Sequence, residues 1–222
     1  MAGLNALIGA ELFRFSNDAF SGQEAALPIH ISRFPGPKTV YGGGQSSQEI
    51  QALEMQPTLA SWFLKQLHNL DDVIDLDFVF LDDPEKSLIN VYLDSEIVGF
   101  DASPDSQVLG LATQNIQGLF GYKWIDPVRP DLWWDIFLNT PALRLQPHYL
   151  QYALLHEFGH ALGLEHPFDD SDFDDWFNLG DPPDGLSWPD GDITVMSYTR
   201  PSDGWPITYS GLDLAALAKA WG

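Results

Sequence analysis

The sequence of 222 residues contains no cysteine, so disulfide bonds contribute nothing to the stability of this protein. Basic residues are few: 10 lysines and arginines stand against 32 aspartates and glutamates, giving a formal net charge of -22 at pH 7. Such a surface repels nucleic acids and anionic membranes, so we expect neither as a partner. No apolar run approaches the ~20 residues that span a bilayer, which predicts no membrane insertion. Met1–Ala10 also lacks the basic leading segment of a secretory signal.

The rest of the composition is typical of a globular protein, with 45% hydrophobic residues. A chain of this length can bury a substantial core, and we expect a single folded domain over residues 28–222. Residues 1–27 show no sustained hydrophobic period and contain turn-like segments. They are expected to form an N-terminal arm or a short pro-segment.

Hydrophobic periodicity predicts an α+β architecture. Helical stripes predict helix from residues 46–47 to Leu70, divided into two at Pro57, and a further helix from Pro147 to about Leu162. Residues 35–45 include three consecutive glycines and are expected to form a flexible loop. Short apolar or alternating runs predict strands at residues 28–34, 74–81, 87–93, 108–113 and 133–140.

The clearest chemical signal is a histidine motif, since residues 156–166 read H-E-x-x-H-x-x-G-x-x-H. Residues four apart on a helix lie about one turn above each other, so His156 and His160 can direct their imidazoles at one metal ion. Gly163 can adopt the left-handed conformation that reverses the chain at the end of a helix. This turn can return His166 to the same ion.

Three neutral imidazoles suit zinc, and a site with three protein ligands leaves a fourth position for water, as catalytic zinc sites do. Glu157 adjoins the first histidine, where its carboxylate can take a proton from that water. A chance match to this motif arises in on the order of one unrelated chain in 10⁵. The sequence therefore predicts a zinc site with His156, His160 and His166 as ligands and Glu157 as general base.

A methionine downstream extends the pattern. Met196 is one of three methionines in the chain and lies in T-V-M-S-Y, residues 194–198. The long zinc motif followed by such a methionine turn resembles the metzincin metallopeptidases. Pro167 after the third histidine and Tyr198 two residues after the methionine resemble the serralysin branch of that family. The resemblance covers nearly the whole chain, most closely over residues 150–222.

This resemblance implies the α+β metzincin fold. Its upper lobe, residues 28–163, would contain a twisted five-stranded mixed sheet with two long helices. Its lower lobe, residues 164–222, would be loop-rich and end in a helix. Gly163 would form the turn between the lobes, and Met196 would form an apolar floor beneath the three imidazoles.

The resemblance further implies a zinc-dependent endopeptidase of secreted type, which acts as a monomer on protein or peptide substrates. Tyr198 would stabilise the tetrahedral intermediate and would be a fifth zinc ligand in the resting enzyme. Residues 199–206 would form a wall of the pocket on the leaving-group side. An edge strand would hold the substrate by its backbone, although an ordinary edge strand is an equal alternative; the residues concerned are Gly110, Leu111 and Ala112.

Three alternatives remain open at this point. A matrixin-like peptidase would use the same chemistry in a different cleft, and a zinc-holding module could bind peptides without cutting them. Residues 169–192 contain nine aspartates and neither lysine nor arginine. These carboxylates could coordinate calcium in an irregular site or form a solvated acidic loop, but their spacing does not match a helix-loop-helix calcium site.

Overall fold

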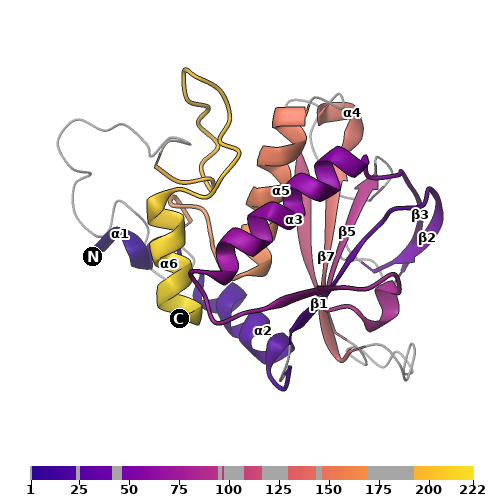
Figure 1. Ribbon diagram of the computed structural model, residues 1–222, viewed down its shortest axis with the longest axis horizontal. Helices are drawn as coiled ribbons and strands as arrows, with labels where there is room; N and C mark the ends of the chain where they lie inside the picture. The colour runs from indigo at the N-terminus through magenta and orange to yellow at the C-terminus, as the bar shows by residue number, and fades with distance from the viewer. Residues whose placement is uncertain are drawn as a thin grey trace.

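The computed structural model describes residues 2–23, 26–41, 47–94, 97, 108–116, 130–143, 147–169 and 193–222. Its centre is a five-stranded sheet with the strand order β4-β1-β5-β7-β6 (Figure 1). Neighbouring strands are parallel, except that β6 runs antiparallel to β7 at one edge. This confirms the predicted α+β class with a five-stranded mixed sheet. The strands are β1 (Leu27–Ile31), β4 (Phe78–Phe80), β5 (Ile89–Asp94), β6 (Gly110–Ile116) and β7 (Leu132–Asn139).

Two 15-residue helices cover one face of the sheet: α3 (Pro57–Asp71) and α5 (Pro147–Ala161) (Figure 1). The central strands are buried along nearly their whole length, as expected for parallel strands covered on both faces. Phe63 of α3 meets Phe158 of α5 edge to face, with ring centroids 5.1 Å apart. The two helices and the sheet thereby enclose the main hydrophobic core, which fixes α5 over the strands.

A hairpin of β2 (Gly36–Val40) and β3 (Gln48–Ala52) packs on the other face of the sheet. The predictions of a loop over residues 35–45 and of helix before Pro57 were therefore wrong in the parts that form these strands. Only Val40, Ile50 and Ala52 of the hairpin are buried, so its apolar pattern is too sparse to be recognised. A single helix begins at Pro57, because proline suits the first turn of a helix and not its interior.

The segments nearest the two ends of the chain lie together: α1 (Ala2–Asn5), α2 (Ala10–Phe20) and the C-terminal α6 (Gly211–Trp221) (Figure 1). Helix α2 contacts both α5 and β7 and buries Ser16, Ala19 and Phe20. The segment expected to be an N-terminal arm or a short pro-segment thus contains a packed helix. The helix was missed because α2 contains Ser16, Asn17 and Asp18, which are residue types that commonly form turns. Within the described residues, no helix combines the length and the apolar character that a membrane span requires.

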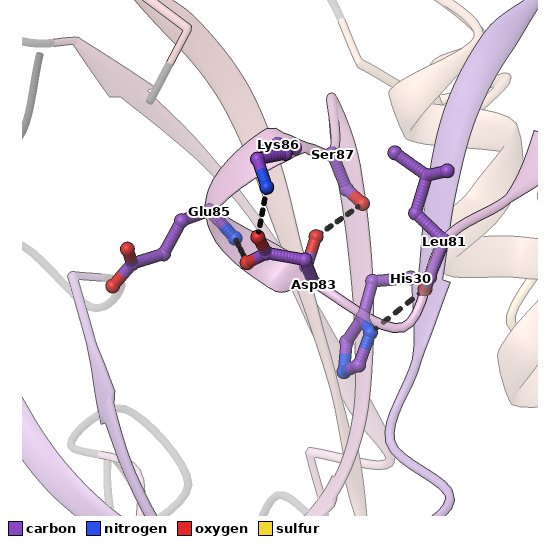
Figure 2. A network of polar contacts seen from close by, with 6 residues as sticks. All are labelled: His30, Leu81, Asp83, Glu85, Lys86 and Ser87. Atoms are coloured by element: carbon purple, nitrogen blue, oxygen red, sulfur yellow. Dashed lines mark hydrogen bonds and ion pairs between the residues drawn. The ribbon is translucent and has the colours of Figure 1, made fainter. Parts of the chain in front are cut away.

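His30 of β1 is buried and joins the sheet to the turn after β4 (Figure 2). Its Nδ1 donates a hydrogen bond to the carbonyl oxygen of Leu81 at 3.1 Å, and burial lowers the pKa of its ring. In the same turn, Asp83 caps the short helix η1 (Pro84–Lys86) by accepting from the Glu85 amide at 3.1 Å. Lys86 pairs with the same carboxylate at 2.9 Å. A further short helix, α4 (Thr140–Leu143), follows β7.

Candidate metal centre

Three histidine side chains converge where α5 ends. His156 and His160 lie one turn apart on the helix, and the chain then reverses at Gly163, which has a φ of 92°. The Nε2 atom of His166 lies 3.1 Å from that of His156 and 3.2 Å from that of His160. One nitrogen from each ring falls within 4.8 Å of the other two. The structure thus brings together the three residues predicted as zinc ligands.

The spacing of these nitrogens fits a tetrahedral metal site. Zinc–nitrogen bonds of about 2.0–2.1 Å at tetrahedral angles place two ligand nitrogens about 3.3 Å apart. Imidazole nitrogens that all bear lone pairs would repel each other at 3.1–3.2 Å unless a positive charge lay between them. The group could therefore hold a metal ion.

The outer nitrogens of two rings are anchored to the backbone. Nδ1 of His156 donates to the carbonyl oxygen of Val195 at 2.9 Å, and Nδ1 of His160 donates to that of Leu164 at 2.8 Å. These bonds place the ring protons on Nδ1 and leave the Nε2 lone pairs free for a metal, as is usual for metal-binding histidines. Burial lowers the pKa of His160 to about 4 and that of His166 to about 3, and it lowers the pKa of His156 as well. All three rings are thus neutral at pH 7, which is the form that binds metals.

Glu157 belongs to α5, and its side chain faces the edge strand β6. Its side chain is only 7% exposed, and burial raises its pKa to about 8, although a hydrogen bond from the Ala112 backbone opposes this shift. Gly110 lies so close that a Cβ atom there would be 2.6 Å from Cγ of Glu157. Two of the three predicted substrate-binding residues therefore adjoin the predicted base. Leu111 between them packs on the hairpin side of the sheet.

The methionine turn, residues 194–198, packs against the part of α5 that carries the histidine motif. Met196 is fully buried, and a Cβ atom at Gly159 would be 2.7 Å from its sulfur. Gly159 is the residue directly before His160. A larger residue does not fit there, because the Met196 side chain occupies the space beside it. Met196 thus packs against the turn of α5 that carries His156 and His160.

Sequence reasoning missed the residue that holds this turn in place. Asp213 of α6 is fully buried and accepts hydrogen bonds from the Thr194 hydroxyl at 2.6 Å, the Val195 amide at 3.0 Å and the Ser210 amide at 2.8 Å. Val195 is the residue whose carbonyl orients His156. The sequence did contain a signal, because Ser210 and Asp213 have the spacing of a helix capping box. That spacing predicts where α6 begins, but it does not predict the hydrogen bonds that Asp213 accepts from the methionine turn.

Tyr198 lies at the rim of the histidine cluster. Its ring centroid is 4.6 Å from that of His166 and 5.5 Å from that of His156, yet 61% of the side chain is exposed. The structure thus brings Tyr198 to the histidines.

An apolar cavity of about 560 Å³ opens beside His156 and Glu157. Trp205 belongs to the predicted wall segment and stacks on Tyr152 of α5, with ring centroids 4.2 Å apart. The Tyr152 hydroxyl donates to the carbonyl oxygen of Ser197 at 2.7 Å, which ties the wall to the methionine turn. Tyr152 could not be selected from the sequence, because its position in the predicted helix is that of an ordinary core residue. Other residues that line the cavity are Val108, Leu109, Gly110, Tyr149, Ala153 and Tyr198.

The chain matches no model of a known protein family, and a search of curated protein sequences also finds no match. Residues 170–192, which carry most of the aspartates considered as calcium ligands, lie outside the described residues.

Proposed function

We propose that this protein is a zinc-dependent endopeptidase of the metzincin type, with a catalytic domain similar to that of serralysins. One observation carries the proposal: three histidines with converging ring nitrogens adjoin a cavity that His156 and the buried carboxylate of Glu157 line, at a strand edge that has no partner strand among the described residues. A carboxylate in this place can act as general base toward a metal-bound water, and such an edge can bind an extended peptide as a further strand.

His156, His160 and His166 would hold the metal. Their neutral imidazoles and the 3.1–3.2 Å spacing support zinc over calcium or magnesium, which prefer oxygen ligands. When bound, the ion would polarise the scissile carbonyl group and lower the pKa of a water molecule.

The edge strand β6 would bind the substrate. Its partner β7 lies on one side, and no described strand pairs with its other side. An extended peptide could therefore add to the sheet as a further strand through backbone hydrogen bonds. The absence of a side chain at Gly110 leaves room for Glu157 next to that peptide.

Glu157 would act as the general base and then as the general acid. It takes a proton from the attacking water and delivers it to the departing amine. Its pKa of about 8 reflects burial beside uncharged groups, and a neighbouring cation would lower this value toward that of a base at neutral pH. The bond from Ala112 keeps the carboxylate at the substrate-binding edge.

Tyr198 would donate a hydrogen bond from its hydroxyl to the oxyanion of the tetrahedral intermediate. In the resting enzyme its oxygen would be a fifth metal ligand. The apolar cavity beside Glu157 would receive a substrate side chain on the leaving-group side. Its aromatic wall of Tyr149, Tyr152 and Trp205 favours a large uncharged side chain.

The experiment that tests this proposal is cleavage of unfolded casein by the zinc-loaded protein, followed by mass spectrometry of the fragments. We expect cleavage that a chelator abolishes and that zinc restores. The Glu157→Ala variant should keep zinc but cleave slower by about 10²–10⁴-fold. Zinc binding without any fragments would indicate a peptide-binding module instead. A structure of the zinc form without a tyrosine oxygen on the metal would favour a matrixin-like site.

A further inference from the structure

The turn between the second and third histidines is held by the N-terminal segment. The last carbonyl groups of a helix lack partners within the helix and must find them elsewhere. At the end of α5, the Ser16 hydroxyl donates to the carbonyl oxygen of Ala161 at 2.8 Å. The Gly9 amide donates to that of Gly163 at 3.0 Å. Residues far apart in the sequence thus complete the helix end.

A short antiparallel bridge continues this pairing. Ile8 is opposite Leu164, and the Glu165 amide donates to the Leu7 carbonyl oxygen at 3.1 Å. Residues 7–9 therefore hold the backbone of residues 163–165, which directly precede His166, through hydrogen bonds. Leu7 is fully buried, so this segment is fixed in the core.

The side chains of α2 press on the same turn. A Cβ atom at Gly163 would lie 2.9 Å from Cα of Phe13, so the close approach of the helix depends on this glycine. The Phe13 ring packs against Trp221, with centroids 5.0 Å apart, and the Trp221 indole donates to the carbonyl oxygen of Leu162 at 2.8 Å. Both ends of the chain thus enclose the ligand turn.

The turn in its observed form orients two of the three ligands. Leu164 accepts the hydrogen bond that fixes the Nδ1 proton of His160, while its own amide donates to Gly159 at 2.9 Å. The direction of the backbone through residues 163–165 also determines where His166 lies. A change in this short stretch would misplace His166 and release His160 together.

We infer that residues 7–20 are a built-in support of the metal site, which positions His160 and His166, and that they are not a pro-segment to be removed. Phe13 and Ser16 are the positioning residues. This inference rests on the proposed metal centre and concerns how tightly it binds zinc. If the turn adopts its binding-competent form only one tenth of the time, apparent zinc affinity falls about tenfold.

Two matched pairs of variants in zinc-loaded protein test the inference. Phe13→Ala removes the ring over the turn, whereas Phe15→Ala removes a ring of the same helix that packs on Trp134 of β7. Ser16→Ala removes the bond to Ala161 together with the acceptor of the Trp134 indole at 3.1 Å, and the unfolding midpoint reports the second loss. Ser21→Ala removes an exposed bond to Asp18 at the end of the helix. The readouts are the zinc dissociation constant, measured by competition with a chromophoric chelator, and the unfolding midpoint of each zinc-free protein.

We expect Phe13→Ala and Ser16→Ala to bind zinc about tenfold more weakly than the unmodified protein. Phe15→Ala and Ser21→Ala should bind within about twofold, even though loss of the Phe15 ring lowers the unfolding midpoint. Equal zinc affinity for the two phenylalanine variants would overturn the inference. A protein that shows the expected affinity pattern but never cuts casein would refute the proposed peptidase and leave the support intact.

Discussion

Replacing Gly110 by alanine should disable the proposed base without touching the metal ligands. An ideal Cβ atom at this position would lie 2.6 Å from Cγ, 2.7 Å from Oε1 and 2.9 Å from Cδ of Glu157. These separations are about 1 Å shorter than ordinary carbon contacts. Because the backbone of β6 is paired with β7, the Glu157 side chain is the part that must move.

The expected magnitude follows from this displacement. A catalytic group misplaced by about 1 Å loses about 10²-fold in rate. We therefore expect kcat on a fluorogenic peptide to fall by about that factor, with zinc affinity unchanged. Refitting a buried side chain costs about 1–3 kcal/mol, which should appear as a modest loss of stability in urea unfolding.

Gly211→Ala is the matched control, because a Cβ atom at this position of α6 meets nothing within 4 Å. It should leave turnover unchanged and slightly stabilise the helix. Turnover of Gly110→Ala within about threefold of the unmodified protein would refute the placement of the base, because a shift of this size must be felt there. Loss of zinc from Gly110→Ala would show that the substitution acts on the ligands.

Three further predictions concern the surroundings of the site. Asp213→Asn places an amide donor opposite donors of the methionine turn. It should lower the free energy of unfolding in urea by about 1–3 kcal/mol and weaken zinc binding. Unchanged stability would contradict the hydrogen bonds assigned to this carboxylate. Trp205→Ala removes the stacked wall of the cavity, so in a peptide library it should reduce the preference for large apolar leaving-group side chains; an unchanged preference would place that subsite elsewhere. The pKa of His30 is lowered in the folded state, so the unfolded state binds more protons as pH falls below about 6.5 and stability decreases there. His30→Gln should reduce this loss, measured as the difference in unfolding free energy between pH 7 and pH 5 for the zinc-loaded proteins, and an identical loss in both would exclude His30 as its source.

Short-range patterns predicted much of the structure. The apolar runs that form β5 and β7 are buried strands, and the spacing of four between His156 and His160 places both rings on one side of α5. In each case neighbouring residues along the chain determine the local geometry. The requirement for glycine at position 163 was also predictable, because a left-handed residue ends the helix there.

What could not be predicted depends on partners distant in the chain. The hydrogen bond between Leu7 and Glu165 joins backbone groups, which nearly every residue has, so no side chain in the sequence predicts it. The role of Asp213 could not be predicted for a different reason. Its position in the capping box already accounts for an aspartate there, so nothing in the sequence indicates its contact with Thr194. The hairpin β2–β3 buries too few residues to show a strand period.

These two sets of long-range contacts act on the same property of the proposed metal centre. A histidine that binds a metal through Nε2 is oriented by the group that accepts its Nδ1 proton. For His156 that acceptor belongs to Val195, which Asp213 of α6 holds. For His160 it belongs to Leu164, which pairs with Ile8. The motif therefore contains the proposed ligands, whereas segments near the two ends of the chain hold in place the carbonyl groups that accept their Nδ1 protons. A copy of α5 alone would lack this preorganisation, and we expect it to bind zinc weakly.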